Sequence, residues 1–401
     1  NTSMGYPLTG TKRKHMYIRD VKDDHLIYDF NDGMVYTEHN RIKSKYLENR
    51  QAGFIFKASL KDEPTKIGKE KVRVFQGMPI AAQMVTRSLF LPLLSFLSLE
   101  PLLSECAVGI NPFSREWDTL HHHICKFGEE RIVAGDYAKW DMRLPAGLVM
   151  EAFDILIELA EETGHYSDDD IKIMYGLAFD ISNPTVNYNG TIIQFHGSNP
   201  SGQNLTAHLN SICNSLVQRM AFYSMNDHSL SFRDSVSTMT YGDDFMSSVR
   251  LGVIYDHILL RNFCATELDI VLTMPNKTDV AIPYMCMKDV DFLKRKSVFS
   301  IDLGVHVGQL DLSSIHKSLY TSMASSSMEK LNCVAVVESA IHEVFYHGRD
   351  IFEYYRTLLL DSMSALGLIA PKLFLSYDAR VNIWHVKYNK KRSYAKLSLL
   401  D

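Results

Sequence analysis

Alternating and continuous apolar stretches indicate short strands in the middle of the chain. Residues 131–137 (RIVAGDY) predict a buried strand that ends at a carboxylate. Residues 185–195 predict a β-hairpin, because an Asn-Gly pair, a strong turn signal, lies between two strand-like runs. Residues 235–249 predict a second hairpin that turns at a Gly-Asp pair. In this part of the chain, strands therefore alternate with helices.

Helical patterns occupy other parts of the chain. Residues 144–162 predict a helix with recurring apolar positions. Ser167, followed three residues later by Asp170, resembles a helix N-cap, so the acidic run there indicates a solvated first turn rather than a metal site. Residues 328–360 contain few turn signals and predict helix. Together these elements predict an α+β protein with a helical C-terminal lobe.

The most apolar stretch, residues 88–99, contains Pro92. Spanning a bilayer core of ~30 Å takes about 20 helical residues, and this stretch is shorter. We therefore predict a buried helix here and no transmembrane segment.

Composition excludes several classes of protein. Hydrophobic residues make up 46% and charged residues 22% of the 401 residues, which disfavours disorder and a disulfide scaffold. The six cysteines lack the C-x-x-C spacing of a zinc knuckle or redox motif. A net charge of −5 argues against a simple basic nucleic-acid coat. That average hides two basic ends, however, since residues 1–75 carry +5 and residues 381–401 carry +4 around an acidic middle of −14.

Two acidic motifs are candidates for chemistry. In Asp136-Tyr-Ala-Lys-Trp-Asp141, one carboxylate ends the predicted strand and another follows five residues later. In Tyr241-Gly-Asp243-Asp244, two carboxylates lie at a hairpin tip. Hard oxygen ligands suit Mg²⁺, and two such ions about 4 Å apart stabilise the attacking and leaving oxygens of an in-line displacement. Taken alone, either motif is equally consistent with an ordinary turn or capping Asp.

A polar motif follows the Pro200-Ser201-Gly202 loop. Thr206 and Asn210 are four residues apart, so they lie on one helix face. That face offers hydroxyl and amide groups to a polar ligand such as ribose, although by itself the motif fits an ordinary capped helix better.

A basic motif precedes it in the chain. Lys69, Lys71 and Arg73 alternate, so in a strand they would point to one face as a row of cations for phosphates. The alternative is a solvated, charged edge strand.

Two further motifs are disfavoured as sites. His121, His122 and His123 are consecutive and cannot all converge on one metal ion from a helix or strand, so a surface cluster is expected. The Gly68-Lys69-Glu70 segment lacks the preceding Gly and the Ser or Thr of a phosphate-binding loop, which disfavours an ATPase.

In their order and spacing, the motifs resemble those of the RNA-directed RNA polymerases of positive-strand picorna-like RNA viruses, the picornavirus, dicistrovirus and marine picorna-like group. The segments similar to that family's motifs are 2–7 (motif G), 61–75 (F), 136–141 (A), 201–210 (B), 241–244 (C), 273–277 (D) and 292–295 (E). Seven motifs in order are far more specific than any one of them.

The resemblance implies a fold and a domain division. Family members have an α+β right-hand architecture with an antiparallel-sheet palm and a mainly helical thumb. By this analogy, residues 1–93 and 181–199 form the fingers, 94–180 and 200–296 the palm, and 297–401 the thumb.

The resemblance also implies a reaction. It is template-directed RNA synthesis, in which NMP is transferred from an NTP to the 3′-OH of the growing strand to replicate a viral genome. Asp136 and Asp243 would bind two Mg²⁺ ions, for which Mn²⁺ can substitute, and Asp244 would assist. Lys277 would be the general acid that protonates the leaving pyrophosphate.

The remaining roles concern the nucleotide and the RNA. Residues implied to detect the ribose 2′-OH are Asp141, Ser201, Thr206 and Asn210; a deoxy substrate would leave this network unpaired. Residues implied to hold the triphosphate are Lys66, Lys71 and Arg73. Residues implied to contact RNA are Thr2, Ser3, Gly5, Lys61, Phe292, Lys294 and Arg295.

The expected partners are template and product RNA and NTPs, with a genome-linked viral peptide as a candidate primer. The expected location is the host cytoplasm, at membrane-associated replication complexes, after release from a polyprotein. The family's N-terminal extension, which precedes motif G, is missing here, so we expect that an upstream segment has been lost.

Two alternatives stay open. A reverse transcriptase shares the palm carboxylates, although Asp141 and Asn210 favour a ribonucleotide. A non-catalytic RNA-binding protein with a decayed polymerase fold is the other, and the presence of all expected carboxylates disfavours it.

Overall fold

The chain forms two compact units, each with its own hydrophobic core. Unit 1 comprises Asn1–Gly109 and Val133–Tyr284, and unit 2 comprises Ile110–Ile132 and Met285–Asp401. The computed structural model describes residues 3–22, 25–31, 33–63, 68, 72–275, 280–320, 329–368 and 374–388.

Unit 1 contains most of the strands. They are β1 (Met16–Lys22), β2 (His25–Phe30), β3 (Ile55–Leu60), β4 (Val74–Gly77), β5 (Ile132–Tyr137), β6 (Thr185–Tyr188), β7 (Thr191–Gln194), β8 (Val236–Tyr241), β9 (Asp244–Val249) and β10 (Leu272–Thr273). The helices of this unit are α1 (Lys12–His15), α2 (Gly33–Leu47), α3 (Ile80–Leu99), α4 (Pro101–Ser104), α6 (Trp140–Arg143), α7 (Ala146–Thr163), α8 (Asp168–Ser182), α9 (Thr206–Met225) and α10 (His257–Glu267).

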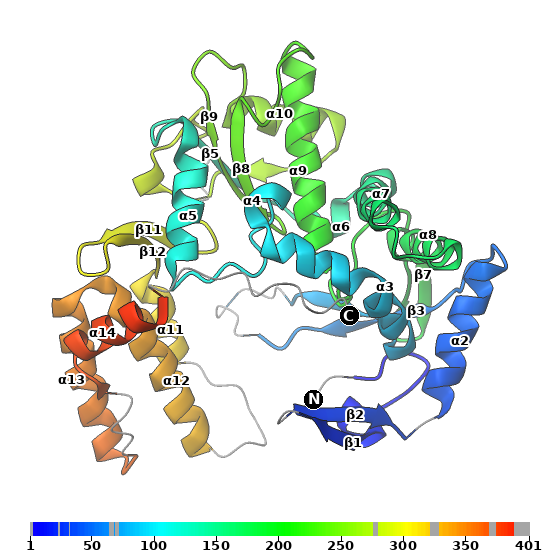
Figure 1. The fold of residues 1–401 in the computed structure, drawn as a ribbon, viewed down its shortest axis with the longest axis horizontal. Helices are drawn as coiled ribbons and strands as arrows, with labels where there is room; N and C mark the ends of the chain where they lie inside the picture. The colour runs from blue at the N-terminus through cyan, green and yellow to red at the C-terminus, as the bar shows by residue number, and fades with distance from the viewer. Residues whose placement is uncertain are drawn as a thin grey trace. The chain divides into compact units, whose positions relative to one another are not determined.

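A four-stranded sheet in the order β10-β5-β9-β8, here called the central sheet, carries the acidic motifs. β8 and β9 pair antiparallel from Val236↔Val249 to Tyr241↔Asp244, which confirms the hairpin over residues 235–249. β10 pairs antiparallel with β5 at Thr273↔Asp136. Helix α9 packs against β8, as Figure 1 shows. Buried residues dominate both hairpin strands, so the sheet is held from its faces as well as by its ladder.

A second sheet has the order β4-β3-β6-β7. β3 runs parallel to β6 and antiparallel to β4, while β6 and β7 form the predicted hairpin over residues 185–195. β1 and β2 form a separate two-stranded sheet. The prediction that Lys69, Lys71 and Arg73 form a row of cations on one face of a strand is not tested, because residues 69–71 lie outside the described part of the chain and β4 begins at Val74.

The predicted helices of unit 1 are confirmed. Residues 144–162 correspond to α7, whose apolar face is buried in the core of the unit. Ser167 and Asp170 form a complete capping box at the start of α8, so the acidic run is a first helical turn, as expected.

Helix α3 is longer than the apolar stretch suggested, since it begins eight residues earlier at Ile80. Among the described residues it is the one helix long and apolar enough to cross a membrane, by length and composition alone. Half of that apolar window is buried inside the protein, and Val85, Leu89 and Phe90 belong to the core of unit 1. This packing is that of a core helix.

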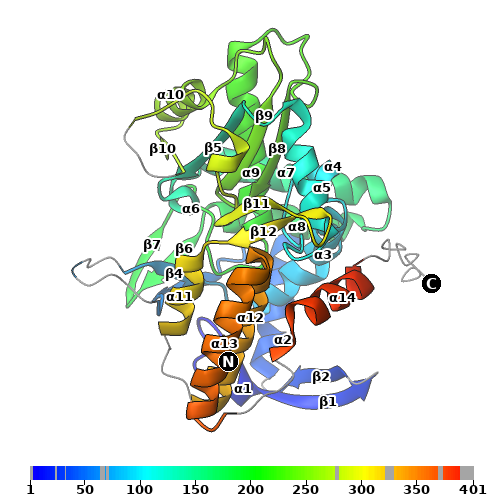
Figure 2. The same ribbon diagram turned by 90° about the vertical axis from the view of Figure 1, so that its left-hand side faces the viewer.

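Unit 2 is mainly helical around one hairpin. Its elements are α5 (Arg115–Ile124), the 3-10 turns η1 (Cys125–Phe127), η2 (Met287–Asp289) and η3 (Phe345–His347), strands β11 (Arg295–Ser300) and β12 (Val305–Leu310), and helices α11 (Leu312–Tyr320), α12 (Glu329–Val344), α13 (Arg349–Ala365) and α14 (Tyr377–Tyr388). Helices α12 and α13 lie side by side, as Figures 1 and 2 show.

Two predictions for unit 2 need correction. The helix predicted over residues 328–360 is interrupted, because η3 and Gly348, with φ +88°, separate α12 from α13. The three consecutive histidines are not simply a surface cluster, because helical spacing turns His121 inward, to 5% exposure, while His122 stays exposed.

Candidate functional site

The central sheet brings the acidic motifs together. Asp136 is near the end of β5, which is the neighbour of β9 in the sheet. Asp243 lies in the turn between β8 and β9, and Asp244 is the first residue of β9. The Thr273 hydroxyl of β10 donates to the Asp136 carbonyl oxygen at 3.0 Å, which fixes the backbone of β5 at this point. Sheet topology thus joins residues more than a hundred positions apart in one acidic site, as the motif order predicted.

The carboxylates crowd one another electrostatically. Reduced hydration raises the pKa of Asp243 above its usual value, and the negative charges of Asp136 and Asp141 add to this effect. Reduced hydration also raises the pKa of Asp141. The positive charge of Arg73 opposes both shifts, so its side chain belongs to the same site. A site with excess negative charge favours binding of a cation.

Neutral groups of α9 hold the hairpin turn. The Gly242 N–H donates to the Ser211 hydroxyl at 2.8 Å, and Asn214 Nδ2 donates to the Gly242 carbonyl at 3.1 Å. Gln218 Nε2 donates in turn to Asn214 Oδ1 at 3.1 Å, and its own oxygen accepts from the Thr238 hydroxyl on β8 at 2.9 Å. Both backbone groups of Gly242 are thereby fixed, and the turn presents its carboxylates at a defined position.

A second network positions the loop after Asp141. The Asn199 N–H donates to the Asp141 carbonyl at 2.7 Å, and Asn199 Nδ2 donates to Asn210 Oδ1 at 2.8 Å. Gln203 Nε2 donates to Asn199 Oδ1 at 2.8 Å. The Thr206 hydroxyl donates to the carbonyls of Pro200 and Gln203, so it fixes the loop that leads into α9. Asp141 and Asn210, predicted to act together, are therefore linked through Asn199.

The loop that carries Ser201 packs against β4. Ser201 itself is exposed. Gly202 forms a bridge with Gly77, and a Cβ at Gly202 would lie 2.3 Å from the Gln76 carbonyl oxygen. Only glycine fits this close backbone approach. The strand that follows Arg73 and the loop that begins α9 are thus held together by a residue without a side chain.

The cations of the basic motif share one acidic partner. Glu63 Oε2 lies 3.4 Å from Arg73 Nη1 and 3.8 Å from Lys61 Nζ. Both cationic side chains are about half exposed or more, at 63% and 47% respectively. The described part of the chain does not include Lys66 and Lys71, nor Lys277 of motif D and Thr2 of motif G.

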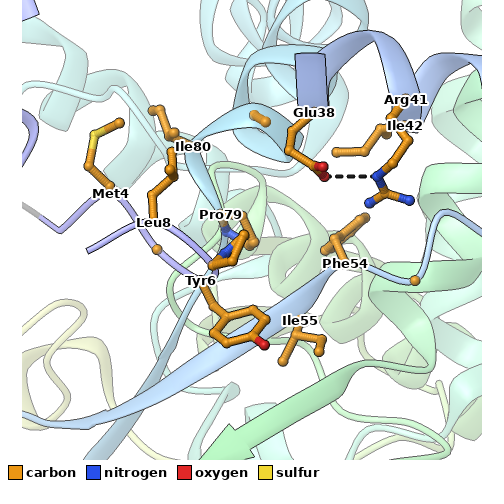
Figure 3. Close-up of a pocket in the computed structure, with 14 residues that line it drawn as sticks. Met4, Tyr6, Leu8, Glu38, Arg41, Ile42, Phe54, Ile55, Pro79 and Ile80 are labelled. Carbon is orange, nitrogen blue, oxygen red and sulfur yellow. Dashed lines mark hydrogen bonds and ion pairs between the residues drawn. The ribbon is translucent and has the colours of Figure 1, made fainter. Parts of the chain in front are cut away.

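Ser3 and Gly5 belong to a loop that packs beside a cavity of about 290 Å³. The Ser3 hydroxyl accepts from the Gly5 N–H at 3.2 Å, and the fully buried Met4 accepts from the Ile80 N–H at 2.9 Å. Figure 3 shows Tyr6 beneath Pro79 and beside Ile55 of β3. The segment is therefore anchored at Met4, while Ser3 stays exposed.

The three motif E residues lie in unit 2 and differ in accessibility. Phe292 is 1% exposed and packs near Trp117. The Arg295 guanidinium forms two hydrogen bonds with Glu343, at 2.6 and 2.9 Å, so its charge is already paired. Lys294 is exposed. Of these residues, Lys294 alone presents an accessible charge, and contact with RNA stays a prediction.

Several residues of the site were not predicted from the sequence. Asn199, Gln203, Ser211, Asn214 and Gln218 are buried and carry the two hydrogen-bond networks. A signal was present, because polar residues recur every fourth position along α9 from Thr206 to Gln218. Such a stripe on a buried helix predicts polar partners.

The chain matches known polymerases along most of its length. The family described as viral RNA-dependent RNA polymerase matches residues 1–359. The replicase polyprotein of Drosophila C virus (strain EB) is 27% identical over 323 residues, which cover 76% of this chain and 18% of that protein. The replicase polyprotein of Cricket paralysis virus is 25% identical over 384 residues, 90% of this chain and 21% of that protein. The chain thus spans about a fifth of these curated relatives.

Solved structures show the same fold. The Sicinivirus 3Dpol RNA-dependent RNA polymerase matches with a TM-score of 0.75 at 20% identity, covering 96% of this chain and 77% of that one. The fold is therefore the α+β right-hand fold of viral RNA polymerases. The chain belongs to the viral RNA-dependent RNA polymerase family. The resemblance found in the seven motifs is confirmed.

Proposed function

We propose that this chain synthesises RNA on an RNA template by nucleotidyl transfer from NTPs, and so replicates a viral RNA genome. The observation that carries the proposal is the meeting of Asp136 with the Asp243–Asp244 turn in the central sheet. In the reaction, the 3′-OH of the growing strand attacks the α-phosphate of the NTP, and pyrophosphate leaves.

The donor set fits magnesium. Three carboxylates supply hard oxygen ligands, and the pKa of Asp243 is raised by burial first and by the neighbouring charges of Asp136 and Asp141 second. Asp136 and Asp243 would hold two Mg²⁺ ions, with Asp244 assisting, and Mn²⁺ could substitute. When bound, the two ions would stabilise the charge on the attacking and leaving oxygens.

The protein's own cations serve the triphosphate. Arg73 and Lys61, paired with Glu63 in this structure, lie where their charges reach Asp141. A triphosphate would compete with Glu63 for them. We assign Lys66 and Lys71 to the same task, and Lys277 to protonation of pyrophosphate, by analogy with the family motifs.

The Asn199 network supports a role in sugar selection. Because Asn210 Oδ1 accepts from Asn199, the Asn210 amide N–H groups are the ones left for a 2′-hydroxyl acceptor. Asp141 and Ser201 complete the proposed 2′-OH site, and Thr206 shapes its loop. Rejection of dNTPs follows when these groups lack their partner.

The wider setting rests on the relatives. They are polyproteins, which supports release of this chain from a longer precursor. The division into fingers, palm and thumb, RNA contact by Thr2, Ser3, Gly5 and Lys294, a peptide primer, and action at cytoplasmic membrane-associated complexes are proposed on the same analogy.

Primer extension on RNA with Mg²⁺ tests the proposal. The wild type and Asp169→Ala, a control that removes an exposed carboxylate of α8, should extend the primer with NTPs and reject dNTPs. Asp243→Ala should not extend it. Equal extension by Asp243→Ala would refute the site, and equal use of dNTPs would favour a reverse transcriptase. RNA binding without extension by any variant would favour the non-catalytic alternative.

A further inference from the structure

Unit 2 contains a cluster of metal-ligating side chains that the polymerase chemistry does not use. Asp118 and His122 are four residues apart on α5, so they share a helix face, and β12 places His306 beside them. One ligand atom from each residue can be chosen so that all three atoms lie within 4.8 Å of one another. Only His122 of the three consecutive histidines takes part, so the site does not require all three to converge on one ion.

We propose that Asp118, His122 and His306, here called the α5–β12 triad, bind a divalent transition-metal ion of the zinc class. Two imidazoles and a carboxylate form a ligand set that zinc favours, whereas Mg²⁺ prefers oxygen ligands alone. His122 is 68% exposed, so the fourth position would open to solvent and take a water molecule.

The contacts of the triad already resemble those of a binding site. Asp118 Oδ1 accepts from the backbone N–H of His306 at 2.8 Å and lies 2.9 Å from His306 Nδ1. Its second oxygen, Oδ2, lies 3.7 Å from His122 Nε2. Tetrahedral zinc with bonds near 2.0–2.1 Å brings its ligand atoms to roughly 3.3 Å apart. The exposed His122 side chain needs only a small rotation to meet that spacing.

Neighbouring groups orient the buried side of the triad. The His121 ring stacks on the His306 ring, with centroids 3.6 Å apart and planes 14° from parallel. Ser297 Oγ lies 2.9 Å from His121 Nδ1 and fixes that ring in turn. Supporting contacts of this kind hold metal ligands in position and are expected around a real site.

A second group nearby, His121, Cys125 and Glu129, is the competing location. Burial, with help from Glu129, raises the pKa of the Cys125 thiol to about 12, and zinc binds the thiolate. His121 in this group is also engaged by Ser297 and by stacking on His306. In the α5–β12 triad, by contrast, His306 already holds the Asp118 carboxylate in place. The triad is therefore favoured over the competing group.

An ion in the triad would join two distant stretches of sequence within unit 2. α5 belongs to the segment Ile110–Ile132, and His306 to the β11–β12 hairpin. An ion that binds only the folded form stabilises it, so zinc should raise the melting temperature of the protein.

Zinc titration tests the proposal. Zn²⁺ is added to the purified protein against a chromophoric chelator, with millimolar Mg²⁺ present to occupy the oxygen-ligand site of unit 1. Wild type should bind one Zn²⁺ per chain. His122→Gln and Asp118→Asn each remove a proposed ligand, so they should bind Zn²⁺ more weakly by at least the roughly 10–100-fold that loss of an outer-shell contact costs, and they should lose the zinc-dependent rise in melting temperature.

The variants separate the possible locations. His122 is exposed, so His122→Gln should fold, and a wild-type circular dichroism spectrum checks this. His123→Gln is the matched control from the same helix, and Cys125→Ser tests the competing group; both should bind like wild type. No zinc binding by wild type, unchanged binding by His122→Gln, or loss of binding in Cys125→Ser would each overturn the proposal.

Discussion

Replacing Asn199 with alanine separates sugar selection from catalysis. Asn199 is 1% exposed, and its side chain donates to Asn210 Oδ1 and accepts from Gln203 Nε2, each at 2.8 Å. Its backbone N–H holds the Asp141 carbonyl at 2.7 Å and stays in the variant. Asn199→Ala therefore cuts the link to Asn210 and leaves the backbone of the Asp141 loop bonded.

The magnitude follows from the partners that are lost. The side chains of Asn210 and Gln203 lose their bond at about 1–3 kcal/mol each, so the free energy of unfolding should fall by about 2–6 kcal/mol. The Thr206 carbonyl, which accepts a third and longer bond from Asn199 at 3.3 Å, is only partly buried and adds little. Water entering the space of the lost side chain moves the value toward the lower end. If Asn210 loses the orientation for one neutral hydrogen bond to the 2′-OH, worth about 0.5–1.5 kcal/mol, selection of ATP over dATP should fall about two- to twelvefold.

Single-nucleotide incorporation measures kcat/KM for ATP and dATP, and urea unfolding measures stability. Asn262→Ala, on the exposed face of α10, is the control and should change neither quantity appreciably. If Asn199→Ala is destabilised but keeps the wild-type ratio of ATP to dATP, the network only supports the fold and the proposed sugar-selection role is wrong.

Three further predictions concern the same site. Gly202→Ala should lower the free energy of unfolding by about 1–3 kcal/mol in urea and slow extension, because its Cβ would overlap a backbone carbonyl, whereas Gly147→Ala in open space on α7 should not. The folded-state pKa of Asp243 is raised, so the contribution of this carboxyl to stability is present at pH values below its usual pKa and is lost as the pH rises past the raised pKa. In EDTA, Asp243→Asn should therefore have a higher melting temperature than wild type at pH 7, but not at a pH below the usual pKa. Glu63→Gln should lower the KM for NTPs about two- to tenfold by freeing its cations, while Glu48→Gln, which breaks other exposed pairs, leaves the KM unchanged.

The sequence predicted the parts of the site whose signals are local. The β8–β9 hairpin was readable because a Gly-Asp pair separates two strand-like runs, and β5 because an apolar run ends at a carboxylate. Their adjacency was not readable from local pattern, since β5 and β9 are separated by α6 to α9 along the chain. Motif order supplied that information instead.

The burial of polar residues could not be predicted from the sequence. The polar stripe of α9 that includes Asn214 and Gln218 fits a solvent-facing helix face equally well, and only contact with β8 and the turn shows that both residues are fully buried. In the same way, a row of three histidines gives no sign of His306, which β12 supplies from far along the chain. Tertiary partners decide the role of a polar residue, and local pattern does not contain them.

The side chains that hold the turn beside the carboxylates are neutral, so they fix its position without reducing its negative charge. Gly242 is held by Ser211 and Asn214, which fix the turn without offsetting the charge of Asp243. The positive charge that acts on Asp243 comes from Arg73, which is itself paired with Glu63. A cationic side chain in place of Ser211 or Asn214 would have lowered the pKa of Asp243 and weakened the binding of a divalent cation by its carboxylate. With a neutral anchor, the turn is rigid while its negative charge stays available, so binding of divalent ions and of the triphosphate should reinforce each other.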